Sequence, residues 1–298
     1  MNGNDALAGR FDAYRPPLRA VAYRMLGSLG DAEDAVQEAW FKPNRSDVSE
    51  VANLGGRLTT VVGRVRLDML RSRAARREET LEVHDGPGRL PDPVVGPPGR
   101  IDPEQEVLLA DSVGIAPMVV RESLSPAERL AFVLHDLFAV PFEAIAPLVD
   151  KTPAATRQLV SRARRRVRGG APAPDADLVG LRRVVDAFLA ASRSGDFEAL
   201  VAVLDPEVVA RSDGGALLPS LLRRGAADVA AQAVLFARLA SDARPVLVNG
   251  TPGVASLVDG RAVSVMAFTV RGGLITALDV LTDPERLAAL DLGPALEG

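Results

Sequence analysis

The sequence predicts a multidomain protein in which two all-α modules precede an α+β domain. Apolar residues recur at helical spacing from Phe11 to about Arg77 and again from Pro103 to about Arg168. Stretches rich in Pro and Gly, at 84–103 and 169–174, interrupt this pattern. Beyond them, helical and strand-like runs alternate, which indicates helices packed on a curved antiparallel sheet. A chain of 298 residues is long enough for several hydrophobic cores.

The first module is expected to consist of helices alone. An apolar stripe that ends at Leu26 predicts one helix, and the run Gly27–Gly30 breaks it. Asp31 is placed to cap the next helix. After a polar loop, a long helix is predicted from Arg57 to about Arg77.

The Pro- and Gly-rich stretches set the expected domain boundaries. Helical domains are expected at 8–80 and 104–169, linkers at 81–103 and 170–176, and an α+β domain at 177–292. In that last domain, helices are predicted at 177–194, 196–204 and near 226–240. Strands are predicted at 207–211, 244–249, 253–258, 261–270 and 274–281.

The segment PFEAIAPLVDKTPAATRQLVSRARRRVR has the features of a helix-turn-helix. Its second helix is predicted to begin with Thr152 as N-cap and Pro153 at the first helical position. Leu159, Ala163 and Val167 recur every four residues and are expected to face inward. The side chains expected to face DNA are those of Thr152, Thr156, Arg157, Gln158, Ser161, Arg162 and Arg165.

Basic residues are clustered although the net charge is −4. No acidic residue occurs from Thr152 to Arg168, where six arginines lie, and a second arginine cluster runs from Arg64 to Arg77. Unscreened like charges at helical spacing are mildly destabilising, so a phosphate partner is the favoured explanation. A solvated basic face on a purely structural helix is the alternative.

Two stretches together resemble a known family. SLGDAEDAVQEAWF followed by GGRLTTVVGRVRLDMLRSRAARRE is similar to the polymerase-binding and minus-10-reading region of extracytoplasmic-function RNA polymerase sigma factors. LSPAERLAFVLHDLFAVPFEAIAPLVDKTPAATRQLVSRARRRV is similar to their minus-35-reading region. The resemblance implies a transcription initiation factor with core RNA polymerase and promoter DNA as partners.

The resemblance also assigns roles to residues. Asp34, Gln37 and Glu38, with Trp40 at the end of the same helix, are implied to dock on the β′ clamp helices of the polymerase, and the minus-35 module on the β flap. Contacts to minus-10 DNA are implied for Arg57, Arg64, Asp68 and Arg71. The helix-turn-helix residues named above are implied to contact the minus-35 element.

The chain departs from the family pattern near the minus-10 surface. Relatives usually carry a Pro-Arg-Ala-Trp-Leu-like run where this chain has Leu54–Leu58, so that Arg57 replaces an aromatic residue. Lys42-Pro43 also ends the preceding helix early. These departures leave the minus-10 sequence and the strength of promoter melting open.

The third domain resembles the SnoaL-like fold of the nuclear-transport-factor type, which is fused to one branch of these sigma factors. The run LVGLRRVVDAFLAASRSGDFEALVAVLDPEVVARSDGG opens it. Linker, loop and tail motifs of that branch have partial matches in RLPDP, DGG and TDPERL. The resemblance implies that this domain regulates activity in cis, through contacts of Pro91, Asp92, Pro93, Asp213, Gly214, Gly215, Asp283, Pro284 and Leu287.

Because this fold also occurs in enzymes, a catalytic domain such as a cyclase, isomerase or hydrolase is an alternative. The chain's His and Tyr residues, at positions 84, 135, 14 and 23, all lie outside this domain. Its acids are expected mostly at caps and turns: Asp196, Asp205, Asp213, Asp242 and Asp259. Asp279, within a strand-like run, is the acid to inspect for burial, and no enzymatic activity is expected.

The remaining expectations concern location and ligands. The chain has no Cys, no signal-peptide pattern and no long apolar run, so a cytoplasmic protein without membrane contact is expected. No cofactor and no metal are expected. A small ligand in the third domain and a separate anti-sigma partner are left open, as is the alternative of a stand-alone helix-turn-helix regulator that senses a ligand.

Overall fold

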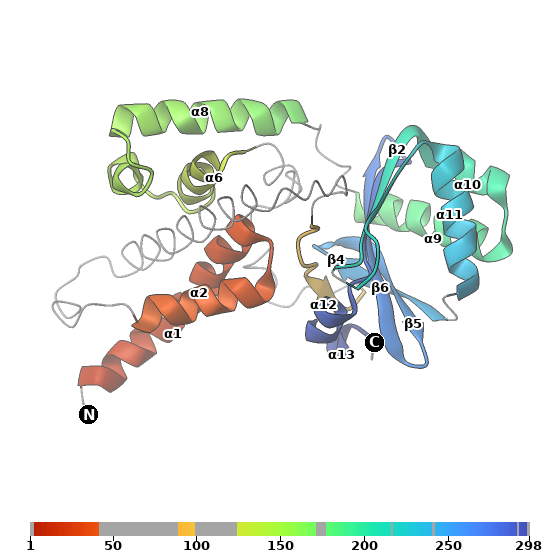
Figure 1. Cartoon of the computed structure of the whole chain (residues 1–298), viewed down its shortest axis with the longest axis horizontal. Coiled ribbons are helices and arrows are strands. Elements are labelled where there is room, and N and C mark those ends of the chain that lie inside the picture. The colour runs from red at the N-terminus through yellow and green to blue at the C-terminus, as the bar shows by residue number, and fades with distance from the viewer. Residues whose placement is uncertain are drawn as a thin grey trace. The chain divides into compact units, whose positions relative to one another are not determined.

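The structure, a computed structural model, describes residues 3–41, 89–98, 124–170, 177–215, 217–239, 242–290 and 292–296 (Figure 1). The chain divides into two compact units. Unit 1 comprises Met1–Val83 with Glu106–Pro172, and unit 2 comprises His84–Gln105 with Ala173–Gly298. In the part of the chain that is described, no helix combines the length and apolar character needed to cross a membrane.

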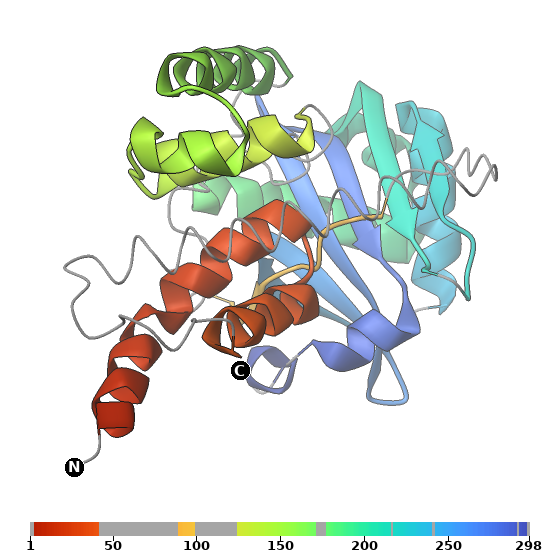
Figure 2. The same cartoon turned by 60° about the vertical axis from the view of Figure 1, so that its left-hand side comes forward.

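Unit 1 is helical, as predicted. Its helices are α1 (Gly3–Leu26), α2 (Leu29–Phe41), α6 (Pro126–Phe132), α7 (Phe142–Ile145) and α8 (Pro153–Gly170). A π-helical turn, η1 (Val133–Leu137), follows α6, and a 3-10 turn, η2 (Ala146–Leu148), follows α7. Helix α8 packs on α6 and α7, and Figures 1 and 2 show it lying along their outer side.

The first helix ends where the sequence predicts. Gly27 has a φ of +70°, and its amide donates to the carbonyl of Tyr23, which is a common way to end a helix. The prediction that Asp31 caps α2 is wrong, because the helix begins two residues earlier, at Leu29. The amide of Asp31 donates to the hydroxyl of Ser28 at 3.2 Å, so Ser28 supplies the capping oxygen.

The carboxyl end of α1 is joined to α6 by a buried arginine. Arg129 is 7% exposed. Its Nη1 donates to the carbonyl of Met25 at 3.0 Å, and its Nη2 donates to the carbonyl of Leu124 at 3.3 Å. The Met25 carbonyl is one of those that the end of α1 leaves without a partner inside the helix. Arg129 therefore satisfies a helix end that lies 104 residues away in the sequence.

Replacing Arg129 by Met tests this contact, because Met keeps an apolar stem and removes the donors. We expect unit 1 to lose about 2 kcal/mol of unfolding free energy, since each unsatisfied buried polar group costs roughly 1–3 kcal/mol. Chemical denaturation of the full chain, with hydrogen exchange to assign the change to unit 1, measures this. Arg165→Met, at an exposed arginine of the same unit, is the matched control. A loss equal to that of the control would contradict the expected role.

Unit 2 is built on one seven-stranded sheet with the order β1-β4-β5-β6-β7-β2-β3. The strands are β1 (Val95–Gly96), β2 (Leu204–Asp213), β3 (Leu221–Arg224), β4 (Asp242–Val248), β5 (Thr251–Val258), β6 (Arg261–Arg271) and β7 (Leu274–Leu281). Neighbouring strands are antiparallel except β2 and β7, which are parallel. The predicted antiparallel sheet is thus confirmed with one parallel pair, which arises because β3, a helix and the β4–β6 meander intervene between those two strands.

Helices cover both faces of this sheet. α9 (Leu178–Ser194), α10 (Phe197–Val203) and α11 (Ala226–Leu239) lie on one face, and the short helices α12 (Pro284–Ala289) and α13 (Gly293–Leu296) lie on the other (Figure 1). Asp177 and Asp196 cap α9 and α10 through their carboxylates, at the starts that the sequence predicts. The α+β architecture expected from the resemblance to the nuclear-transport-factor type is confirmed.

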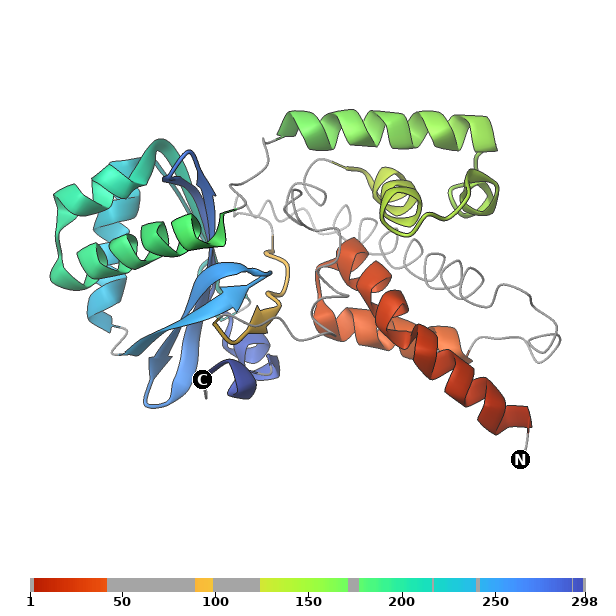
Figure 3. The ribbon, with the colours of Figure 1, turned by 180° about the vertical axis from the view of Figure 1, so that it is seen from behind.

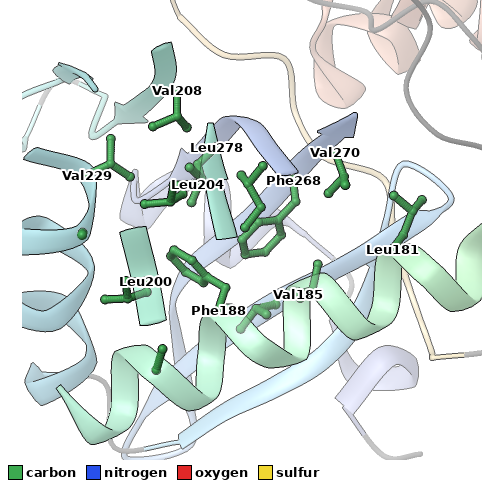
Figure 4. Packing of buried hydrophobic residues seen from close by; sticks show 14 residues of the cluster. Leu181, Val185, Phe188, Leu200, Leu204, Val208, Val229, Phe268, Val270 and Leu278 are labelled. Atoms are coloured by element: carbon green, nitrogen blue, oxygen red, sulfur yellow. The ribbon is translucent and has the colours of Figure 1, made fainter. Parts of the chain in front are cut away.

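The larger core of unit 2 lies between α9 and the sheet. Leu181, Val185 and Phe188 recur on one side of α9 and point at the strands (Figure 4). The ring of Phe188 meets that of Phe268 on β6 edge to face, with centroids 5.4 Å apart and planes at 71°. The domain's interior is therefore filled by hydrophobic side chains at this point.

A second, smaller core lies on the opposite face of the sheet. It contains Val95 of β1 together with Val246, Leu281, Leu287 and Leu292. Val95 comes from the segment that the sequence predicts to be a linker. Over its described residues, 89–98, this segment instead packs on the sheet and adds β1 to the edge of β4 (Figure 3). The sequence also misses β3, α12 and α13, which are too short to show a period.

Candidate DNA-reading helix and buried arginine cluster

The turn before α8 forms as the sequence predicts. Asp150 adopts a φ of +53°, a conformation that Asp tolerates better than most residues. The hydroxyl of Thr152 accepts from the amide of Ala155 at 3.2 Å, so Thr152 is the N-cap and Pro153 the first helical residue. The amide of Lys151 donates to the carbonyl of Ala146, which closes the turn.

The predicted inner face of α8 is confirmed and extended. Leu159, Ala163 and Val167 are buried, and Val160 is fully buried beside them. Thr156 is predicted to face DNA, and this is wrong, because its side chain has no exposed surface. Its hydroxyl donates to the carbonyl of Thr152 at 3.0 Å, since residue 156 lies one turn before 159 and 160 on the same face. The remaining predicted residues are exposed: Thr152, Arg157, Gln158, Ser161, Arg162 and Arg165.

Two other arginines of α8 are paired inside unit 1. Arg164 donates to both carboxylate oxygens of Asp136, at 2.6 and 2.8 Å. The hydrogen bond to Asp136, together with the charge of that carboxylate, raises the pKa of Arg164 above its ordinary value. Arg166 donates to Glu128 at 2.7 Å. These pairs hold α8 on the preceding helices and partly neutralise two members of the basic cluster.

Glu128 also caps the start of α6. It forms a capping box with Ser125 at the start of α6: its carboxylate accepts from the Ser125 amide at 3.1 Å, and its own amide donates to the Ser125 hydroxyl. The side chain is buried, at 5% exposure. The capping box is a local feature of the run SPAE, whereas the ion pair with Arg166 depends on how α8 packs.

Arg157 lies over an aromatic ring. Its guanidinium carbon is 5.2 Å from the ring centroid of Phe142, the first residue of α7. The imidazole of His135 stacks on the same phenyl ring, with centroids 3.9 Å apart and planes at 29°. Arg157 is exposed, and it stands in the second turn of α8, close to the end that a recognition helix presents to bases.

Helix α2 presents the polar residues predicted to bind the polymerase. Asp34 and Gln37 are exposed and Glu38 is half-exposed, while Ala32, Ala35 and Val36 on the other side of the helix are buried. Trp40 lies within α2, but its side chain is outside the described residues. The predicted minus-10 residues Arg57, Arg64, Asp68 and Arg71 also lie outside the described residues.

In unit 2, a buried arginine joins three segments that are far apart in the sequence. Arg286 of α12 is 8% exposed. Its Nε donates to Asp92 at 2.7 Å, its Nη1 donates to Asp213 at 2.6 Å, and its Nη2 donates to the carbonyl of Leu90 at 2.7 Å. Asp92 and Asp213 are buried as well. We call Arg286, Asp92 and Asp213 the arginine cluster.

Backbone hydrogen bonds extend this attachment along residues 89–98. The amide of Leu90 donates to the carboxylate of Asp213 at 2.7 Å. Four residues further on, the Val94 amide donates to the side chain of Asn249 at 3.0 Å, and the Asn249 amide donates back to the Val94 carbonyl at 2.8 Å. Both ends of the segment before β1 are therefore fixed to the sheet.

The loop and tail motifs meet directly at Gly215. Asp283 caps α12 by accepting from the amides of Glu285 and Arg286. Gly215 has a φ of +67°, and a Cβ at this position would collide with the Asp283 carboxylate. The glycine of the loop is thus required both by its backbone conformation and by the close approach of the helix cap.

The comparisons with known proteins agree along the whole chain. The family model described as sigma-70 region 2 matches residues 10–76. The chain is 38% identical to the ECF RNA polymerase sigma factor SigJ of Mycobacterium tuberculosis (strain ATCC 25618 / H37Rv), over 95% of this chain and 93% of that protein. It is 33% identical to the probable ECF RNA polymerase sigma factor SigI of Mycobacterium tuberculosis (strain CDC 1551 / Oshkosh), over 97% and 98%.

The solved structures give the same result. The crystal structure of the Mycobacterium tuberculosis extracytoplasmic function sigma factor SigJ superimposes with a TM-score of 0.74 at 34% identity, over 96% of this chain and 99% of that chain. The chain belongs to the extracytoplasmic-function RNA polymerase sigma factors. The resemblance drawn from the sequence is confirmed. The alternative of a stand-alone regulator is not favoured, because the relatives that match over nearly the whole chain are sigma factors.

The structure brings most of the predicted contact residues of the linker, loop and tail motifs close to the arginine cluster. Pro93 and Leu287 are buried, and Pro91 is half-buried, whereas Pro284 starts α12 and is exposed. Arg286 was not among the predicted contacts. The signal that could have found it is its place inside the TDPERL run, where a basic residue stands between two of the predicted contact positions.

Two acids of this sigma factor have partners that the sequence does not predict. Asp213 is predicted to sit at a turn, and this is confirmed, because its Oδ1 accepts from the Gly215 amide at 3.1 Å. Its Oδ2 is in addition a buried partner of Arg286. Its carbonyl also accepts from the amide and the hydroxyl of Thr282. Asp279, singled out for burial, is only half-buried and pairs with Arg211 on the neighbouring strand at 3.3 Å. Among the described acids of unit 2, the buried ones, Asp92 and Asp213, are therefore those that hold residues 89–98.

Replacing Arg286 by Met tests the cluster. We expect amide exchange in the peptide covering 89–98 to accelerate by more than about tenfold, because breaking a buried ion pair from one side costs roughly 3–5 kcal/mol. Hydrogen exchange followed by mass spectrometry measures this. Arg224→Met, at an exposed arginine of β3, is the control. Unchanged protection of 89–98 would show that the backbone contacts suffice to hold it.

Proposed function

We propose that this sigma factor reads the minus-35 element with the exposed face of α8. The observation that supports the proposal is that Arg157, Gln158, Ser161, Arg162 and Arg165 are all exposed on one helix, while the apolar residues between them are buried. Arg and Gln near the start of such a helix can bond base edges with two hydrogen bonds each. Arg162 and Arg165, one and two turns further on, are suited to phosphates.

We propose Asp34, Gln37 and Glu38 of α2 as the surface that docks on core polymerase. Carboxylates on an exposed helix face suit a basic protein partner and repel DNA, so they separate the two macromolecular surfaces. The proposal extends, on the family resemblance alone, to Trp40, to the β flap for the minus-35 module, and to Arg57, Arg64, Asp68 and Arg71 for minus-10 DNA. A cytoplasmic location follows from partnership with the polymerase.

The phosphate role of Arg162 can be measured through salt dependence. Arg162→Ala in the full chain, assembled with core polymerase, should flatten the slope of log affinity against log salt by about 0.9, the value for one released counterion in duplex DNA. The probe is a promoter duplex selected by the reconstituted holoenzyme from a library randomised at both promoter elements. Arg193→Ala, at an exposed arginine of unit 2, is the control. An unchanged slope would remove Arg162 from the interface.

We propose that unit 2 regulates the two DNA-reading modules in cis by holding the segment between them. The arginine cluster and the strand β1 attach residues 89–98 to the sheet of unit 2. The connection between the two helical modules is therefore attached to unit 2 through residues 89–98 and is not a free linker. A fixed anchor narrows the range of module spacings, and preorganisation of this kind lowers the entropic cost of binding both promoter elements.

Deletion of residues 175–298 is a poor test of this role, because it also removes the sheet on which Val94 and Val95 are buried. Arg286→Met releases the segment by one substitution. We expect the variant holoenzyme to discriminate less between promoters whose minus-35 and minus-10 elements are separated by different spacers. Open-complex formation on a series of such promoters measures this, with Arg224→Met as control. An unaltered spacer preference would contradict regulation through the anchor.

We propose that unit 2 acts as a structural regulator and that catalysis is not its task. Five described acids of unit 2 serve the fold: Asp92 and Asp213 bind Arg286, Asp279 binds Arg211, and Asp196 and Asp283 cap helices. General acid–base catalysis needs a side chain that is free to exchange a proton with a substrate. Residues 177–298 contain no His or Tyr that could replace these acids.

A further inference from the structure

We propose that Phe142 is a positioning residue for minus-35 recognition, because its ring holds Arg157 in the orientation that reads a base. The proposal rests on the role proposed for Arg157. It concerns a residue outside α8, on the preceding short helix, which the sequence motif alone does not single out. The evidence is the stacked group formed by His135, Phe142 and Arg157.

The phenyl ring of Phe142 is itself held in place. Pro141, whose ring restricts its own φ, precedes Phe142 at the start of α7, and its carbonyl accepts from the amides of Ala144 and Ile145 at 3.0 and 3.2 Å. The His135 imidazole stacks on the ring at 3.9 Å, and its Nδ1 lies 3.0 Å from the carbonyl of Val140, at hydrogen-bonding distance. The ring is half-buried, so it is a fixed platform that remains accessible to Arg157.

The geometry of a guanidinium makes such a platform useful. Arg157 is exposed, and a free arginine side chain at the surface samples many rotamers. Contact between its guanidinium and a phenyl face is attractive and restricts that freedom. The N–H donors lie in the plane of the guanidinium, so contact through its face leaves its edge available. That edge is the part that bonds guanine O6 and N7.

Two substitutions of Phe142 distinguish the contribution of its aromatic face from that of its apolar volume. Phe142→Leu keeps an apolar side chain and removes the aromatic face, whereas Phe142→Tyr keeps the face. Arg157→Ala and the double variant Phe142→Leu/Arg157→Ala complete a double-mutant cycle. Phe236→Leu, at an exposed phenylalanine of α11, controls for the substitution itself.

Each full-length variant is assembled with core polymerase, and two quantities are measured: affinity for the selected promoter duplex, and base preference in a library randomised only across the minus-35 element. We expect Phe142→Leu to weaken binding about two- to fivefold, the factor that corresponds to an exposed cation–π contact. The loss should come with a weaker preference at the same base position that Arg157→Ala affects. Phe142→Tyr and Phe236→Leu should match the wild type, and the double variant should be no weaker than Arg157→Ala.

Three results would overturn the proposal. One is a Phe142→Leu variant with wild-type affinity and base preference alongside a defective Arg157→Ala variant, which would leave the role of Arg157 intact. A second is a double variant weakened by the product of the two single losses, because Phe142 would then act independently of Arg157. A third is failure of Phe142→Tyr to restore the preference. An Arg157→Ala variant with unchanged preference would instead refute the proposed reading by Arg157, on which this inference depends.

Discussion

The organisation of unit 2 depends on one buried arginine. Arg286 places a single positive charge between two carboxylates and a backbone carbonyl, and it joins residues that are 73 and 194 positions distant in the chain. Removing three charged groups from water is expensive, and the attraction between them offsets that cost only when the geometry is good and the remaining polar atoms are satisfied. Here Asp213 also accepts from the Leu90 amide, and the guanidinium uses all three of its nitrogens. Such a cluster contributes little net stability compared with a hydrophobic replacement, but it specifies one attachment for the linker.

Pairing of arginines with acids also organises the helices around α8. Six arginines lie between Thr152 and Arg168 with no acid among them, yet two of those described are neutralised by acids from other helices of the unit. Glu128 and Asp136 bind Arg166 and Arg164 and so fix α8 on its support. The arginines of α8 thus fall into two groups. Arg164 and Arg166 pair with acids of the unit, whereas Arg157, Arg162 and Arg165 are the ones proposed to contact DNA.

Local chemistry explains where prediction from the sequence succeeded. The N-cap at Thr152, the inward positions of α8 and the starts of α9 and α10 follow from short-range rules about capping and helical period, so they could be predicted without knowledge of the fold. Thr156 shows where such rules fail: a threonine can occupy either face, because its hydroxyl can bond its own helix backbone when buried. Asp213 shows what such rules leave out. An Asp before two glycines is typical of a turn, and its carboxylate does accept from the Gly215 amide, but its other oxygen binds Arg286, 73 residues away.

The sequence by itself determined the family, the succession of two helical modules and an α+β domain, and the buried face of α8, because these depend on period, composition and ordered motifs. Only the tertiary structure decided that residues 89–98 belong to the sheet, that Arg286 of the tail motif binds the linker and loop motifs, and that Arg157 lies over the ring of Phe142. The physical reason is the same in each case: a contact between residues far apart in sequence leaves no periodic trace in either segment, and a charged or aromatic side chain acquires its partner only when the chain has folded.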